Sequence, residues 1–176
     1  GLMILVQAHL RENNPNAAKI LLRNVLQHDA TTNNAAQLFV QTNGSEPQQI
    51  ADTERVLRDA LNKNSRHAAY IRYTLAFSLY RDRLKDTEKT RGMLRELIKR
   101  SPTADGYCKT AISWLLDNAK DENEFKGDLN RILQARKEHP EIPALTRYLN
   151  DWRQSARRNP KNKSQAKLVE SELANA

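Results

Sequence analysis

The chain has 176 residues, with 29 Lys and Arg against 21 Asp and Glu, a formal net charge of +8, and only five Gly and six Pro. Its dominant residue types favour helices over strands, because straight-chain residues lose little side-chain freedom in a helix. No stretch approaches the roughly 18 apolar residues that a membrane-spanning helix needs, and the single cysteine, Cys108, excludes an intrachain disulfide and a thiolate metal cage.

About ten helices are expected along the chain. Alternate helices are predicted at roughly 2 to 12, 33 to 42, 67 to 84, 105 to 119, 143 to 158 and 164 to 174. Four further helices begin at the start signals NNPN at 13–16, SEP at 45–47, DTE at 86–88 and DENE at 121–124. These signals supply capping oxygens and first-turn carboxylates, which favour a helix start because they satisfy free amides and the helix dipole.

The four helices with start signals repeat one pattern of residue types. A small or short residue is followed four positions later by an aliphatic residue, three later by another aliphatic residue or Ala, and five later by a helix stop. The sets are Ala18, Leu22, Val25, Ala30; Thr53, Leu57, Ala60, Ser65; Thr90, Leu94, Leu97, Pro102; and Asp128, Ile132, Ala135, Pro140. Spacings of four and three place the first three members on one helical face. The stops recur every 35 to 38 residues, a period typical of stacked helical hairpins.

This pattern resembles the tetratricopeptide repeat, with a small, an aliphatic and an Ala-like residue in the second helix and Pro102 and Pro140 closing two repeats. The segments AAYIRYTLAFSLYRDR and TEKTRGMLRELIKRSP are also similar to the half-a-tetratricopeptide repeats of RNA-processing scaffolds. The resemblance implies an all-α, right-handed α-solenoid of about five antiparallel helix pairs. Residues 1–158 would form the repeat array, and residues 159–176 a basic turn and a C-terminal capping helix of the same domain.

The sequence contains no constellation typical of catalysis. The four histidines fall in different repeats, three of them at or near helix ends, which favours capping or surface roles. The zinc-protease, phosphate-loop, serine-hydrolase and dinucleotide-binding motifs do not occur. Cys108 lies in an apolar helical pattern, which is typical of a buried and inert thiol. We therefore expect a protein that is not an enzyme and that binds no cofactor or metal.

Aromatic and basic residues of the alternate helices are the candidates for partner binding. In tetratricopeptide arrays the first helices line a concave groove, where Tyr, Trp and Arg often contribute most to binding. The residues expected to face this groove are Tyr73, Tyr80, Lys109, Trp114 and Arg147. The alternative is that the aromatic stripes are core; these are Tyr73, Ala76, Tyr80 and Leu145, Tyr148, Leu149, Trp152, Ala156. The groove interpretation predicts a scaffold that binds a peptide or a partner helix.

The basic charge is concentrated near the C-terminus. Residues 153–167 contain no acidic residue and hold six of the eight surplus charges, on Arg153, Arg157, Arg158, Lys161, Lys163 and Lys167. This basic tract is a candidate contact for RNA, for the nuclear-import machinery or for another anionic surface. The alternative is a solvated helix end followed by a turn. The tract gives the scaffold interpretation a competitor, a subunit of a ribonucleoprotein or RNA-processing assembly.

Compartment and assembly are weakly constrained. The lone cysteine favours a reducing compartment, so we expect a cytoplasmic protein, with the nucleus as the alternative. The chain begins Gly-Leu-Met, and we expect it to be a piece of a longer protein. The end repeats of such an array expose apolar faces, so a homodimer is an alternative to a monomer.

Overall fold

The computed structural model describes residues 1–28, 34–63 and 66–175, which fold into two compact units, Gly1–Met93 (unit 1) and Leu94–Ala176 (unit 2). The described residues form helices and no strand, so the predicted all-α class is confirmed. None of these helices is long and apolar enough to cross a membrane. The predicted helix stops Ala30 and Ser65, and residue 33 of one predicted helix, lie outside the described residues.

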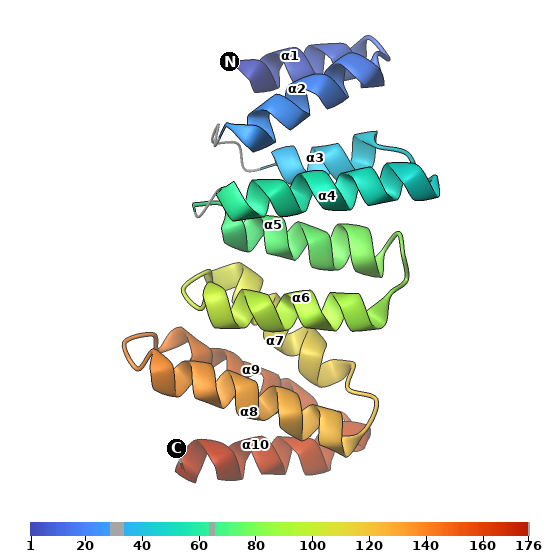
Figure 1. The fold of residues 1–176 in the computed structure, drawn as a ribbon. Coiled ribbons are helices and arrows are strands. Elements are labelled where there is room, and N and C mark those ends of the chain that lie inside the picture. The colour runs from blue at the N-terminus through green and yellow to red at the C-terminus, as the bar shows by residue number, and fades with distance from the viewer. Residues whose placement is uncertain (29–33, 64–65, 176) are drawn as a thin grey trace. The chain divides into compact units, whose positions relative to one another are not determined.

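Unit 1 consists of helices that run in alternating directions (Figure 1). Their bounds are α1 (Leu2–Arg11), α2 (Pro15–Gln27), α3 (Ala35–Thr42), α4 (Pro47–Lys63), α5 (Ala68–Thr74) and the π-helix η1 (Leu75–Arg81). Helix α6 (Thr87–Arg100) starts in unit 1 and ends in unit 2. Helix α2 packs against α1, α3 and α4, and α3 packs in turn against α4 and α5. Each element of unit 1 therefore contacts near neighbours in the sequence.

Unit 2 continues with the same kind of packing. Its elements after α6 are α7 (Asp105–Asp117), α8 (Glu122–Glu138), α9 (Ala144–Arg157), the short 3₁₀-helix η2 (Pro160–Asn162) and α10 (Lys163–Asn175). Helix α9 packs against α7, α8 and α10. The boundary expected near residue 158 falls inside this unit, at the turn between α9 and η2.

The start signals read from the sequence coincide with helix starts. Asn14 caps α2, because its side chain accepts a hydrogen bond from the Ala17 amide at 3.3 Å, and Pro15 takes the first helical position. The carboxylate of Asp121 accepts from the amide of Glu124 at 2.8 Å and caps α8. The start signal at 86–88 acts in the same way, since the Asp86 carboxylate accepts a hydrogen bond from the Lys89 amide at 2.8 Å.

The repeated inner positions form the core of both units. The first three members of all four sets are buried, and the aliphatic positions Leu22, Leu57, Leu94 and Ile132 are completely inaccessible to solvent. The prediction that these residues share a buried helical face is therefore confirmed. Of the stops among the described residues, Pro102 is buried and Pro140 is exposed.

The helix predicted at 67–84 changes its geometry halfway. After α5 the chain continues as η1, and the amides of Asp82 and Leu84 donate to the carbonyls of Phe77 and Leu79, five residues back, at 3.0 and 2.9 Å. A π-turn holds more residues than an α-turn, so it changes the face that later side chains present. The segment ends in a turn at Lys85, whose φ of 54° lies in the left-handed region that usually favours Gly. No feature of the letters LAFSLYR marks this change.

Candidate functional site

Two of the predicted groove residues lie on one exposed surface of unit 2. Lys109 on α7 places its Nζ 3.0 Å from Oδ2 of Asp151 on α9. Arg147 on α9 places its Nη2 3.2 Å from Oδ1 of Asp105 on α7. We call these four exposed residues the α7–α9 face. The two ion pairs link the same two helices in opposite senses, so the face presents alternating charge with no net excess.

A binding partner can replace the ion pairs of the α7–α9 face with its own. All four side chains are substantially exposed, and exposed pairs of this kind contribute between zero and about 1 kcal/mol to stability. A partner that offers its own carboxylates and cations can therefore replace them at little cost. The guanidinium of Arg147 also lies 5.4 Å from the ring centre of Tyr148, which limits its motion.

The remaining aromatic residues of unit 2 divide between surface and core. Trp114 is half-buried in α7 and makes contacts within the protein. The stripe from Leu145 to Ala156 is buried at all of its five positions, as the core alternative required. Within it, Trp152 lies 5.5 Å from Phe125 between ring centres and donates from Nε1 to Asp117 at 2.8 Å. Trp152 therefore holds α9 against its neighbours.

The two predicted groove residues of unit 1 have different environments. Tyr80 is only 1% exposed, so it belongs to the core, and the expectation that it faces an open groove is corrected. Tyr73 is half-buried, and its ring centre lies 4.7 Å from that of Phe77. The guanidinium of Arg81 lies 4.6 Å from the centre of the same Phe77 ring. Tyr73, Phe77 and Arg81 thus form a contiguous row along α5 and η1, in which the two rings are tilted by 56° to each other.

Tyr80 connects η1 to α4 through its hydroxyl. This hydroxyl donates to Oε1 of Glu54 at 2.7 Å and accepts from Nη2 of Arg58 at 2.9 Å. Burial, followed by the hydrogen bond to Glu54 and its negative charge, raises the pKa of the Tyr80 hydroxyl well above its ordinary value. Burial would raise the pKa of the Glu54 carboxyl, but the hydrogen bonds from Tyr80 and Arg58 and the charge of Lys89 lower it overall.

We expect the Tyr80→Phe variant to lose about 1–2 kcal/mol of unfolding free energy at pH 7, because Glu54 and Arg58 each lose a partner. The folded protein keeps Tyr80 neutral beyond its ordinary pKa of about 10, so this contribution is full below pH 10 and falls as the pH rises above it. Urea unfolding followed by circular dichroism measures the loss. Tyr148→Phe is the control, because the Tyr148 hydroxyl is buried without a hydrogen-bond partner in the described structure. Equal losses in both variants would contradict the assignment.

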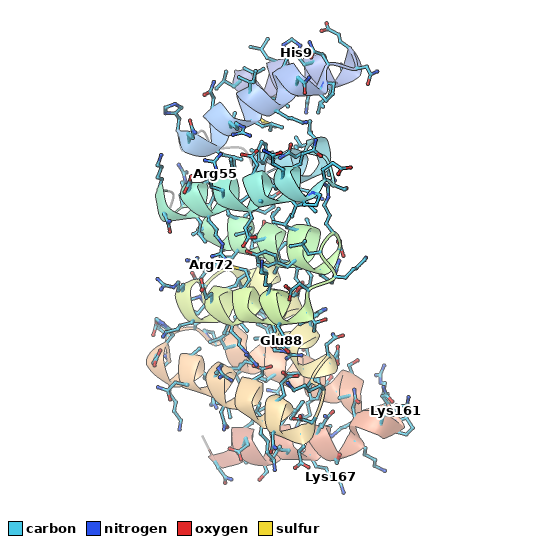
Figure 2. The ribbon with its side chains drawn as sticks, turned by 45° about the vertical axis from the view of Figure 1, so that its right-hand side comes forward. His9, Arg55, Arg72, Glu88, Lys161 and Lys167 are labelled. Atoms are coloured by element: carbon cyan, nitrogen blue, oxygen red, sulfur yellow. The ribbon has the colours of Figure 1, made fainter. Side chains whose placement is uncertain are left out.

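The basic tract divides into two groups in the structure. Arg153 and Arg157 on α9 bind Glu170 on α10, with distances of 3.1 and 2.6 Å to its two carboxylate oxygens. The hydrogen bond from Arg157, together with the nearby positive charges, lowers the pKa of the Glu170 carboxyl. Arg158, Lys161, Lys163 and Lys167 are exposed, and within the described part of the chain none of them forms an ion pair. Figure 2 shows Lys161 and Lys167 on the outer surface of unit 2.

Ion pairs between successive second helices are a feature that sequence reasoning missed. Arg23 on α2 binds Asp52 on α4, and Lys89 on α6 lies 3.4 Å from Glu54 on α4. In unit 2, Nε of Arg95 lies 2.6 Å from Oδ1 of the buried Asp128. The sequence does contain a partial signal, because an arginine directly follows the inner aliphatic residue in three repeats. Two of these arginines, Arg23 and Arg95, form the pairs between second helices, whereas Arg58 pairs with Glu54 within α4.

A cavity of about 300 Å³ lies beside the pair of Arg95 and Asp128 in unit 2. Its walls include the apolar residues Ile98, Leu115 and Ile132, and Arg131 stands at its rim. The charged residues that line it are balanced in sign, so it selects neither an anion nor a cation.

Few side chains of the described residues are placed to bind a metal or to act as a nucleophile. Among the described residues, no three His, Cys, Asp or Glu side chains are placed so that they could hold a metal ion. Cys108 is buried, its Sγ lies 3.1 Å from the Ser101 carbonyl oxygen, and burial raises the pKa of its thiol to about 12. Such a thiol carries almost no thiolate at neutral pH, which makes it a poor nucleophile.

Comparison with known proteins brings no match, whether by family model, by curated protein sequence or by solved structure. The interpretation of function therefore depends on the surfaces described above.

Proposed function

We propose that this protein is a non-enzymatic scaffold, a right-handed α-solenoid of the tetratricopeptide kind that binds a peptide or a partner helix. The arrangement within each unit supports the solenoid, because each helix packs against near neighbours in the sequence and the repeated positions are buried. The buried free Cys108 agrees with the cytoplasmic or nuclear location that belongs to the proposal.

The observation that carries the proposal is the α7–α9 face. It brings together Lys109 and Arg147 from two alternate helices, each in an exposed ion pair that a partner can replace. Rigid helices hold these side chains in place. The protein therefore loses little conformational entropy when a segment binds to them.

The test is affinity purification with the double variant Lys109→Glu/Arg147→Glu. A native lysate is applied to the immobilised protein, which is washed in low salt and then in high salt with nuclease. We expect a defined protein to remain bound through both washes. The variant should capture at least about tenfold less of it, because the ligand no longer meets the cations of Lys109 and Arg147, and the new carboxylates repel Asp151 and Asp105.

The matched control is Lys99→Glu/Arg100→Glu, which makes the same change of charge on two exposed positions of α6 in unit 2. Equal capture by the double variant and the control would show that the α7–α9 face is not the binding site. Loss of every partner on nuclease treatment would favour the second candidate function.

The second candidate function is membership of a ribonucleoprotein or RNA-processing assembly. The observation that favours it is the group of four exposed cations, Arg158, Lys161, Lys163 and Lys167, none of which forms an ion pair within the described residues. Exposed Lys and Arg gain from releasing the counterions of a polyanion, whereas Arg153 and Arg157 are already engaged by Glu170.

A further inference from the structure

We infer that one surface of unit 2, formed where α8 and α10 begin, binds the phosphate backbone of single-stranded RNA. We call it the α8–α10 surface; Lys120, Lys126 and Lys161 line its hollow, and the exposed Arg158, Lys163 and Lys167 precede or follow Lys161 in the chain. This surface shares no residue with the α7–α9 face. The inference is therefore independent of the scaffold function and holds or fails separately from it.

The cations available for binding differ from those of the basic tract. Arg153 and Arg157 are not available, because their guanidinium groups hold α10 against α9 through Glu170. Lys120 and Lys126 are added, and they lie 41 and 35 residues before Lys161 in the chain. These two lysines and Lys161 line one cavity of about 340 Å³. Three elements thus contribute cations to a single hollow, an arrangement that the sequence does not show.

The carboxylates around this cavity are engaged locally. Asp121 caps α8, and Oε1 of Glu122 lies 2.6 Å from Nζ of Lys126 on the same helix. Lys120 lies 3.7 Å from Oε1 of Glu124. Both lysines are exposed, and ion pairs at such positions contribute little, so a phosphate can replace the carboxylates as partner. Lys161 reaches the cavity without an ion pair in the described structure.

The chemistry of the surface favours RNA over a membrane. The large hydrophobic side chains that are exposed in the described residues, Leu2, Ile4, Leu5 and Ile20, belong to α1 and α2, and the α8–α10 surface offers only the half-buried Leu168, which is too little to insert into lipid. Phe125 lines the cavity but is fully buried, which excludes stacking on a base. We therefore expect binding through the phosphates alone, without sequence preference.

Two features favour a single RNA strand over duplex or DNA. A single strand can bend into a hollow that cations from three elements surround, whereas a duplex is stiff over about 150 base pairs. Ser164 and Gln165 also line the cavity, and their side chains offer donors and acceptors for a 2′-hydroxyl group, which DNA lacks.

The experiment is fluorescence anisotropy of a labelled 20-nucleotide oligouridylate with the purified chain. With about four phosphates neutralised, the affinity should fall about 50-fold between 50 and 200 mM salt, a logarithmic slope of about −2.8. Lys161→Gln/Lys163→Gln should reduce the size of this slope by about 1.4, because two contacts are lost. Lys99→Gln/Lys137→Gln removes the same charge from exposed positions elsewhere in unit 2 and should leave the slope within about 0.5 of the parent.

Four results would overturn the inference. The first is no salt-dependent binding of oligouridylate at 50 mM salt, and the second is an equal effect of the two double variants. The third is equal or tighter binding of the matching oligodeoxyuridylate. The fourth is binding of phosphatidylserine vesicles, in place of RNA, with the same dependence on Lys161 and Lys163. All four substituted lysines are exposed, and unchanged circular dichroism would show that the variants are folded. Because no protein partner is present, none of these results bears on the scaffold function.

Discussion

The Leu57→Asp variant is expected to lose the folded structure of unit 1. Leu57 is completely buried at the inner position of α4. Removing a buried leucine side chain costs about 2–5 kcal/mol, and burying a carboxylate in its place adds several more. The total is comparable to the whole stability of a typical domain, about 5–15 kcal/mol. Leu94 occupies the corresponding position of α6 and is equally buried, so Leu94→Asp should have an effect of the same size.

Circular dichroism at 222 nm and a thermal melt measure this loss. Ala51→Asp is the matched control, because it adds the same carboxylate to an exposed position of α4 and should cost less than about 1 kcal/mol. Where the Asp variants do not accumulate in the cell, Leu57→Ala should still lower the unfolding free energy by about 3 kcal/mol. A parental melt for either Leu57→Asp or Leu94→Asp would show that the repeat register is wrong.

The sequence predicted the helices well because local chemistry determines their starts and their inner faces. Asn14, Asp86 and Asp121 cap helices where their neighbours in sequence require it, and the repeated spacing identified the buried face without any tertiary information. The π-helix η1 was not predicted, because nothing in its letters marks it, and the hydrogen bonds of Tyr80 to Glu54 and Arg58 join residues 26 and 22 positions apart. The sequence left two positions open for Tyr80, facing a groove or in the core, and the packing of unit 1 places it in the core.

The candidate surfaces were predictable only in part. The position of Lys109 and Arg147 on the alternate helices follows from the repeat, but their carboxylate partners lie 42 residues away and could not be paired by inspection. The basic tract was visible as a run of charge, yet its division into engaged and free cations depends on Glu170. Similarly, Lys120 and Lys126 join Lys161 only because α8 and α10 begin close together. Pairing across helices is the information that the sequence lacks.

Arg95→Met is expected to destabilise the protein by about 2–3 kcal/mol, whereas Arg131→Met should cost less than about 1 kcal/mol. Both arginines approach the same oxygen of Asp128, whose side chain has 0% exposure. Arg95 is 2.6 Å away and only 28% exposed, while Arg131 is 3.7 Å away and 58% exposed. A buried carboxylate that loses its close partner keeps the cost of its desolvation, but the loss of a distant, solvated cation changes little.

Chemical denaturation of the two variants separates these contributions, since the same charge and nearly the same side-chain volume are removed in each. The larger loss should fall on Arg95→Met at every salt concentration, because a partly buried pair is screened less than an exposed one. Equal losses would mean that Arg131 shares the burden of neutralising Asp128.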